Sequence, residues 1–477
     1  MKRLQRPFSL AAAALVVTVL AGCTLGPNYK RPQMPAPPQH RFVEGPAEAE
    51  SIADVPWWEV VEDPHLVALI RDAIANNLDL QVAAARVEEA RAVAGISKSF
   101  LYPQVGFGAG YGAGQLSGDD EKTFQNWDAG FTLSWEIDLF GRIRRTNEAA
   151  FARYLATEQG RRGVLITLVA DVASNYLLLR QLDLELEVAR RTVESNDETV
   201  IYFVDRLEGG ASNRLEVDQA VANRSRTAIT IPDIEAQIAI TENVLSLLLG
   251  RMPGPIERGA ALEDQHLPPA VPAGIPAALL ERRPDVMAAE QLLVAANANV
   301  GAAKALFYPS ISLTGLLGGL SRDLGDITQG DAAVWNLSAG LLQPIFQGGR
   351  LKRNYEASQA RFQQAMGEYR RAALDGYREV ADSLVLLQKL GEKRGEIQTG
   401  VDALRDAALL SRARYDSGLS SYIEILLADR DLYEQERLLA QTRGEEMRAF
   451  VRLYRALGGG WQPEPETVAV TPSAATP

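Results

Sequence analysis

The first hydrophobic pattern along the chain is an alternation with a period of two residues. In residues 105–113 the odd positions are apolar and the even positions are glycine, and in residues 127–139 apolar residues alternate with mostly polar ones. Residues 310–314 and 335–341 repeat the alternation less sharply. Such alternation predicts β-strands with one apolar and one polar face. We therefore expect two β-hairpins, at about residues 104–140 and 309–346.

These strands fit either a soluble sandwich or a membrane barrel, because both produce the same alternation. Two features favour the membrane. A tilted strand of roughly 9–11 residues crosses a bilayer, and Trp127, Trp135 and Trp335 lie near strand ends, where aromatic residues mark the membrane interface. Four strands cannot close a barrel, which needs about eight, and an open edge in lipid leaves backbone groups unpaired. The pattern thus predicts a barrel shared among subunits and leaves their number open.

The second pattern predicts very long helices. Residues 142–207 and 351–417 contain no proline, and their apolar residues recur at steps of three and four. A helix of about 65 residues would span roughly 100 Å, and the polar positions between the apolar ones predict coiled-coil-type packing. Turns at about 208–213 and 416–421 then reverse the chain, because glycine supplies the positive φ that a reversal needs. One continuous return helix is expected after each turn, at 213–249 and 422–457. The turn glycines are Gly209, Gly210 and Gly418.

The chain contains the same succession of elements twice. Tyr102-Pro103 and Tyr308-Pro309 are 206 positions apart, and Gly210 and Gly418 are 208 apart. This spacing indicates a tandem duplication of about 200 residues. We divide the chain into a signal peptide (1–22), a lipidated extended N-terminal segment (23–60), a first repeat (61–250), a linker (251–276), a second repeat (277–460) and a disordered tail (461–477).

The N-terminus is typical of an export signal. A cationic start is followed by an apolar run that is short for a membrane span, which needs about 20 residues. The run ends in Leu20-Ala21-Gly22-Cys23, and small residues before a cysteine fit the cleavage site of a lipoprotein signal peptidase. We therefore expect a covalent lipid on Cys23; the alternative is an ordinary signal peptide that happens to contain a cysteine. Thr24 replaces the Asp that favours inner-membrane retention, which points to the outer membrane.

Charge and motifs exclude several function classes. The net charge is −12, from 49 Lys and Arg against 61 Asp and Glu. Such an acidic chain is a poor partner for nucleic acid. Cys23 is the only cysteine, so no disulfide is expected, and the three histidines have no metal-ligand spacing. The sequence has no glycine-rich phosphate loop and no nucleophile with a nearby base motif. We predict neither an enzyme nor a cofactor besides the covalent lipid.

Taken together, the motifs resemble those of the TolC-like outer membrane factors, in the lipoprotein branch (OprM/NodT family) of RND-type tripartite efflux systems. The resemblance rests on the Cys23 box, Gly26-Pro27-Asn28-Tyr29, Trp57-Trp58, Asp138-Leu139-Phe140-Gly141-Arg142, and Tyr415-x-x-Gly418 with Tyr422. It implies a homotrimer with a twelve-stranded outer-membrane β-barrel and a long α-helical barrel in the periplasm.

The resemblance also implies partners and a passive mechanism. The expected partners are a periplasmic adaptor, an inner-membrane RND-type transporter and outer-membrane lipid, and the transporter supplies the energy. The Cys23 box and the proline-rich start favour efflux over a type I secretion duct, which is the alternative of the same class. A structural coiled-coil lipoprotein without a pore is the alternative of another class, but it leaves the hairpins unexplained.

In such ducts the helical hairpins close the periplasmic end, where acidic residues can form a ring. Glu216 and Glu424 each follow a turn glycine by six positions, and copies of each near one axis would repel one another and attract cations. A solvated helix face is the alternative. Leu427 stands where the family often has a second acid, so the composition of the ring is open. The candidate gate residues are Glu216, Asp218, Glu424, Arg414 and Arg430.

Overall fold

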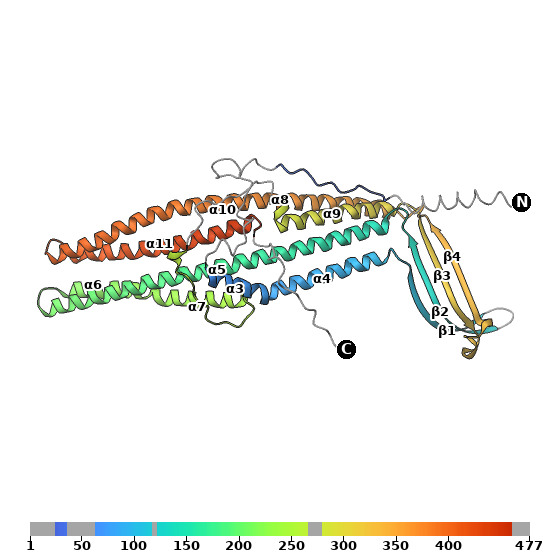
Figure 1. Ribbon diagram of the computed structural model, residues 1–477, viewed down its shortest axis with the longest axis horizontal. Helices are drawn as coiled ribbons and strands as arrows, with labels where there is room; N and C mark the ends of the chain where they lie inside the picture. Colours follow the sequence, from blue (N-terminus) through green and yellow to red (C-terminus); the bar gives the residue numbers. More distant parts are fainter. Residues whose placement is uncertain (1–23, 36–62, 117–121, 266–278, 460–477) are drawn as a thin grey trace. The chain divides into compact units, whose positions relative to one another are not determined.

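The computed structural model describes residues 24–35, 63–116, 122–265 and 279–459 (Figure 1). These residues form two compact units. The sheet unit contains the N-terminal segment, 85–159 and 287–372, and the hairpin unit contains the remaining described residues. The predicted signal peptide, Cys23, the tail 461–477 and part of the linker 251–276 lie outside the described residues.

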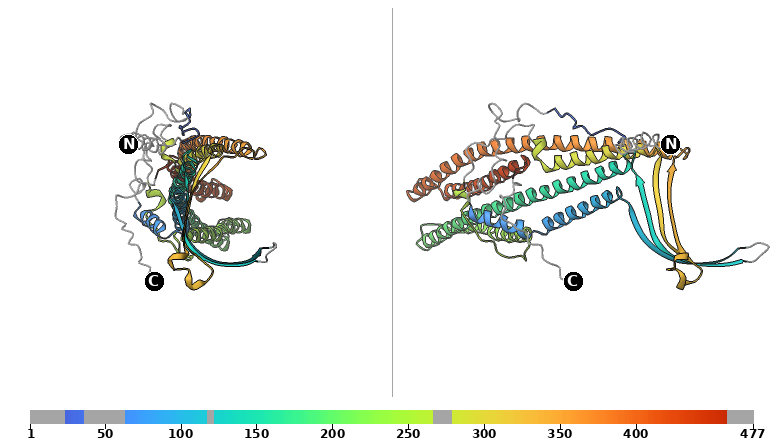
Figure 2. Two further views of the ribbon diagram at one scale, coloured as in Figure 1. Left: turned by 90° about the vertical axis from the view of Figure 1, so that its right-hand side faces the viewer. Right: turned by 45° about the vertical axis from the view of Figure 1, so that its right-hand side comes forward.

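The sheet unit contains a four-stranded antiparallel sheet in the order β1-β2-β3-β4 (Figure 2). Its strands are β1 (Gln104–Leu116), β2 (Lys122–Ile137), β3 (Ser310–Ser321) and β4 (Ala333–Leu342). Two short 3-10 turns, η4 (Leu324–Asp326) and η5 (Gly330–Ala332), connect β3 and β4. The four predicted strands are therefore confirmed. Among the described residues, β1 and β4 each pair with another strand on one side only, so the described sheet has two open edges.

The register of the sheet separates two faces. On one face Phe107 contacts Phe131 at 5.3 Å between ring centroids, and Tyr111 contacts Trp127 at 4.5 Å. On the other face three β1 glycines, Gly106, Gly110 and Gly112, lie opposite polar residues of β2; a Cβ at Gly110 would come within 2.9 Å of the carboxylate of Asp128 paired with it. Glycine on β1 therefore leaves room for the polar side chains of β2, and the apolar face carries the aromatic residues.

Four helices contribute to the sheet unit, and small residues let them approach closely. They are α4 (Leu78–Ser99), α9 (Pro284–Ala305) and the first parts of α5 (Arg142–Glu208) and α10 (Arg350–Asp416). A buried cluster of Ala149, Ala152, Ala295 and Ala298 joins α5 to α9. Each of α4 and α9 ends in a hydrogen-bonded turn just before the Tyr-Pro pair that leads into β1 or β3.

The hairpin unit is built on the later parts of α5 and α10. Its other elements are α3 (Pro64–Asn76), α6 (Arg214–Ala228), α7 (Thr230–Leu248), η2 (Leu262–Asp264), α8 (Leu279–Arg282) and α11 (Tyr422–Ala456). The largest core cluster packs α3, α5, α7, α10 and α11 together. One window of α5 is apolar enough to cross a membrane by length and composition, but half of it is buried, which assigns its apolar residues to this packing.

The prediction of one continuous return helix in the first repeat is wrong. The chain forms α6 and then α7, and Ile229 lies between them. Pro232 explains the interruption, because proline lacks the N–H that would bond to the carbonyl four residues earlier and its ring clashes with that carbonyl. The second repeat has no proline at this place, and α11 is a single helix of 35 residues.

A buried polar cluster fixes the start of α3 to α5. Asp63 caps α3 by accepting a hydrogen bond from the backbone N–H of His65 at 2.9 Å. The hydroxyl of Tyr176 donates to Asp63 at 2.8 Å and accepts from the N–H of Gly259 at 2.8 Å. Tyr176 is fully buried, and this burial raises the pKa of its hydroxyl. The cluster therefore holds the segment that follows α7 against the long helix.

Candidate gate at the helical hairpin turns

The first hairpin turn joins α5 to α6. Gly210 has φ +73°, and backbone N–H groups of the turn donate to carbonyls at the end of α5. Asn213 caps α6 and forms a capping box with Glu216, in which each side chain accepts from the other residue's backbone N–H. The sequence predicts that both Gly209 and Gly210 serve the reversal. In the structure only Gly210 adopts positive φ.

Glu216 serves this turn and also reaches the second hairpin. One carboxylate oxygen accepts from the hydroxyl of Ser212 at 2.5 Å. The other accepts from the hydroxyl of Tyr415 at 3.4 Å. Since Tyr415 lies on α10, this carboxylate connects the turn of one repeat to the long helix of the other. The side chain is thus engaged in local capping and in a contact between the two hairpins.

The second hairpin turn joins α10 to α11 and carries an ion pair. Gly418 has φ +71°, and the N–H of Leu419 donates to the carbonyl of Arg414. Arg414 Nε lies 3.4 Å from Glu424 Oε2, with both side chains nearly half exposed. The structure therefore brings two of the predicted gate residues together across this turn. Such exposed pairs are worth about 0–1 kcal/mol.

The remaining predicted gate residues have local partners. Asp218 pairs with Arg214 one helical turn away at 3.0 Å, and both are exposed. Arg430 pairs with its neighbour Asp431 at 2.8 Å. Within this chain, neither pair links one hairpin to the other.

An aromatic cluster, which the sequence analysis did not single out as a site, joins the two hairpins near their turns. Phe203 of α5 is 1% exposed and contacts Tyr422 at 4.3 Å and Tyr415 at 5.7 Å between ring centroids. Val217, Ala220 and Ile425 complete this core, which we call the tip core. Burial raises the pKa of the Tyr422 hydroxyl to about 12. The two tyrosines belong to the family-like motif, but nothing in the sequence marks Phe203 as their partner.

Polar contacts between the hairpins surround the tip core. On one side, the hydroxyl of Tyr202 donates to Asp416 at 2.9 Å. On the other side, Arg412 donates to Ser195 and to Asp429, each at 3.1 Å. Asp429 is mostly buried, and this desolvation raises the pKa of its carboxyl although Arg412 opposes the shift. The region of the hairpin turns thus contains a largely buried carboxylate that pairs with one arginine.

A groove of about 400 Å³ lies beside these contacts, between α5, α10 and α11. Glu436 is largely buried at its wall and accepts from Arg191 of α5 at 2.7 Å and from Arg405 of α10 at 2.9 Å. One carboxylate therefore ties together helices from both repeats. Among the described residues, no group of three or more His, Cys, Asp or Glu is arranged to hold a metal ion.

Replacing Glu424 with alanine tests the predicted gate directly. We expect a rise of at most about fivefold in the conductance of the closed channel in planar bilayers, because an exposed pair contributes no more than about 1 kcal/mol. Glu434→Ala is the matched control, since Glu434 is an exposed acid on the same helix and lies 4.0 Å from Arg437. Equal conductance of the two variants would assign Glu424 to the solvated helix surface.

The three predicted interface tryptophans lie in different settings on the sheet. Trp135 donates its indole N–H to the carbonyl of Leu101 at 3.1 Å, next to the end of α4. Trp127 stacks on Tyr111 towards the opposite end of β2. Trp335 of β4 is 78% exposed. The two β2 tryptophans are thus eight residues apart on one strand, close to its two ends.

A family model described as outer membrane efflux protein matches residues 69–251 and 275–459. The chain belongs to this outer membrane efflux protein family. The two matched segments contain the long helices, both hairpin turns and all four strands.

Similar proteins cover nearly the whole chain. The cation efflux system protein CusC of Escherichia coli O6:H1 (strain CFT073) is 35% identical over 460 residues, which are 96% of this chain and 98% of CusC. The probable outer membrane lipoprotein SilC of Salmonella typhimurium is 35% identical over 93% of this chain and 97% of its own. The solved outer-membrane channel OprN superposes with a TM-score of 0.87 at 29% identity, covering 92% of this chain and all of that one.

Proposed function

We propose that three copies of this chain form the outer-membrane exit duct of a tripartite efflux system. The duct lies in the outer membrane and conducts substrates passively from a periplasm-spanning pump to the outside. The observation that carries the proposal is a four-stranded sheet with an apolar face and two open edges, attached to long paired helices in a member of an efflux protein family.

The open edges support a shared barrel. In lipid every unpaired backbone group costs several kcal/mol, so β1 and β4 need partners. If β1 of one copy pairs with β4 of the next, the same contact satisfies the backbone hydrogen bonds of both edges in every copy. The copies form a closed ring when the rotations between them add up to a full turn. Three copies give twelve strands, which exceeds the practical minimum of about eight for a barrel.

Exposed apolar side chains on α4 support the same assembly. Val93 and Ile96 lie three positions apart on one face of α4, and Phe100 follows four positions later in the turn just after the helix ends at Ser99. Each of them is more than half exposed in the single chain. An apolar stripe of this kind on a coiled-coil-type helix normally packs against another helix. We assign it to a neighbouring copy of the chain.

The proposed partners follow from the place of the duct in an efflux system. The hairpin turns would meet a periplasmic adaptor, which links the duct to an inner-membrane RND-type transporter. The transporter supplies the energy, and the duct itself catalyses no reaction. The tip core and its polar contacts hold the hairpins closed until the adaptor separates them.

We also propose that Cys23 carries the lipid anchor. The small residues before it, and the description of the relative SilC as a probable outer membrane lipoprotein, support this assignment. Cys23→Ser removes the sulfur that accepts the lipid, so we expect complete loss of radiolabelled palmitate from the purified protein. Palmitate in bulk phospholipid of the same cells is the control. Labelling equal to that of the wild type would contradict the anchor.

The experiment that tests the duct combines assembly with conductance. The detergent-purified protein is cross-linked to count its subunits and then reconstituted in planar bilayers. We expect trimers and discrete conductance steps after the tip is opened by a tip-core variant. A monomer, or a trimer that never conducts, would instead support a structural coiled-coil lipoprotein without a pore.

A further inference from the structure

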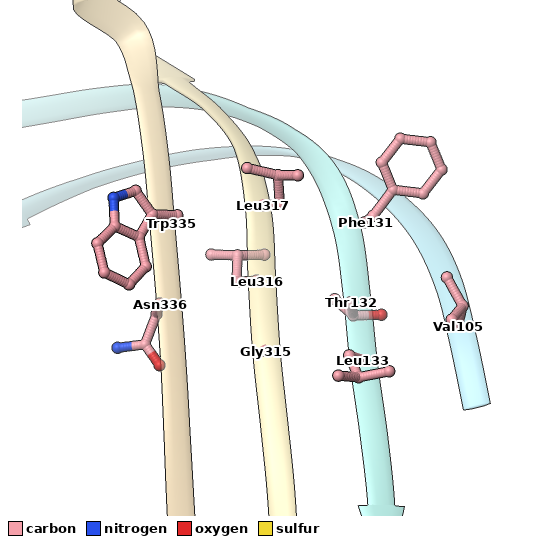
Figure 3. A pocket seen from close by; sticks show the side chains of 9 residues that line it. All are labelled: Val105, Phe131, Thr132, Leu133, Gly315, Leu316, Leu317, Trp335 and Asn336. Atoms are coloured by element: carbon pink, nitrogen blue, oxygen red, sulfur yellow. The ribbon is translucent and has the colours of Figure 1, made fainter. Parts of the chain in front are cut away.

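The apolar face of the sheet has a hollow that no side chain of the described chain fills. It has a volume of about 380 Å³ and lies over β2, β3 and β4, with β1 at its margin (Figure 3). Two cross-strand rows of the apolar face line it, and Thr132, Leu316 and Asn336, which lie between these rows along the strands, complete the lining. One row is Val105, Leu133 and Gly315, and the other is Phe131, Leu317 and Trp335. We call it the Gly315 hollow, because Gly315 occupies its middle strand without a side chain.

Gly315 differs from the other glycines of the central strands. A Cβ at Gly130 would lie 2.8 Å from Gly318 Cα, and a Cβ at Gly318 would lie 2.2 Å from a backbone oxygen, so both positions need glycine for strand packing. A Cβ at Gly315 would meet its nearest atom, in Leu133, at 3.4 Å, which is an ordinary contact. The sheet itself therefore accepts a larger residue at Gly315, and the effect of glycine there is to leave the hollow open.

The first described residues of the N-terminal segment lie beside the same sheet, next to the C-terminal end of β2. The N–H of Leu25 donates to the carbonyl of Phe140 at 3.1 Å, three residues beyond the end of β2. Thr24 packs so closely on Gly141 that a Cβ there would lie 2.5 Å from its methyl carbon. Thr24, the first residue that the structure describes, therefore lies within a few residues of the end of β2.

Four further contacts hold this segment in place. Arg145, 5% exposed at its side chain, donates to the carbonyl of Leu25 at 3.2 Å and to Asn28 at 2.7 Å. Farther along, Arg31 and the hydroxyl of Tyr29 both donate to Glu290 of α9. The described part of the segment is therefore held at several positions between Thr24 and Arg31.

We propose that an acyl chain of the lipid on Cys23 lies in the Gly315 hollow of its own subunit. This inference rests on the lipid anchor proposed above. Leu133 is four residues from the end of β2 at Ile137, about 13 Å along the strand. One leaflet of the hydrocarbon core is about 15 Å deep, so an acyl chain that starts at the foot of β2 reaches the hollow. Its occupant would be a CH₂ chain in contact with valine, leucine and aromatic side chains.

The anchor has an advantage over any free membrane lipid. Its glyceryl group is bonded to the residue next to Thr24, so binding in the hollow is an intramolecular event with a high effective concentration. A free lipid exchanges with the surrounding bilayer, where apolar contacts are equally available, so nothing keeps it in the hollow. The anchor would then set the depth of the sheet in the membrane in addition to tethering the chain.

A photoactivatable palmitate analogue tests the inference. Cells that express the full chain are fed the analogue, membranes are irradiated, and the cross-linked peptides are identified by mass spectrometry. In the wild type we expect cross-links to peptides that contain residues 131–133 and 313–317. Gly315→Leu fills the hollow and should reduce these cross-links at least fivefold, with Gly315→Ala intermediate. Ala339→Leu adds the same bulk on the same face outside the hollow and should leave them unchanged.

Cys23→Ser separates the anchor from free lipid, because phospholipids of this strain still carry the analogue. Cross-links in the hollow that persist in Cys23→Ser would identify a free lipid as the occupant and overturn the inference. Unchanged cross-links in Gly315→Leu would also overturn it. If the wild-type N-terminal peptide carries no analogue, the proposed lipid anchor on Cys23 is wrong. If that peptide carries the analogue but cross-links to residues outside the hollow, only the proposed position of the acyl chain is wrong.

Discussion

Phe203→Ala is expected to raise the conductance of the closed duct in planar bilayers at least tenfold. Phe203 is almost fully buried between Tyr415 and Tyr422, and it joins the first hairpin to the second. Truncating a buried phenylalanine to alanine costs roughly 3–5 kcal/mol through lost contacts and the cavity that remains. Since this free energy holds the two hairpins together, its loss shifts the tip towards the separated state.

Ile201→Ala is the control for this prediction. Ile201 lies two residues from Phe203 on the same helix, but 61% of it is exposed and it takes no part in the tip core. Removing it should change conductance little. If Phe203→Ala assembles normally and conducts like the wild type, the tip core does not hold the gate closed, and the polar contacts around it become the better candidates.

Arg283→Ala is expected to destabilise the hairpin unit by about 1–3 kcal/mol, because it leaves the buried carbonyl of Ala456 without its hydrogen-bond donor. Arg283 is 7% exposed. Its guanidinium pairs with Asp285 at 2.6 Å and with Glu379 at 2.8 Å, and donates to the carbonyl of Ala456 at 2.8 Å. One side chain thus joins α9, α10 and the end of α11. The thermal unfolding midpoint in detergent, followed by circular dichroism, measures the loss.

Arg378→Ala is the matched control for Arg283. Arg378 lies on α10 next to Glu379, is 59% exposed, and pairs with Asp382 at 3.0 Å. Exposed pairs of this kind contribute about 0–1 kcal/mol, so its unfolding midpoint should stay close to that of the wild type. Equal midpoints for the two variants would show that solvent compensates the loss of Arg283 and that the end of α11 is held by other contacts.

Much of the fold could be predicted because its signals are local. Alternation with a period of two marked all four strands, and apolar steps of three and four without proline marked α5 and α10, since each pattern reports which positions of one element are buried. The missed break between α6 and α7 was also local. Pro232 was visible in the sequence, and its steric effect on the helix outweighed the apolar periodicity around it.

The candidate gate could be predicted only in part. The turn glycines and the acids that follow them are found by spacing along one hairpin, and the structure brings Arg414 and Glu424 together as a local pair. Contacts between the hairpins join residues about 200 positions apart, such as Phe203 with Tyr415 and Glu216 with Tyr415. No periodicity within a helix encodes which residue of the other helix it will meet.

The sequence by itself determined the elements, their duplication and the two faces of every strand, because these follow from the chemistry of neighbouring residues. Only the tertiary structure decided which side chains meet: the tip core around Phe203, the buried Arg283, and the hollow over Gly315. The physical reason is that packing depends on the register and rotation of one element against another, and these are set by all contacts together.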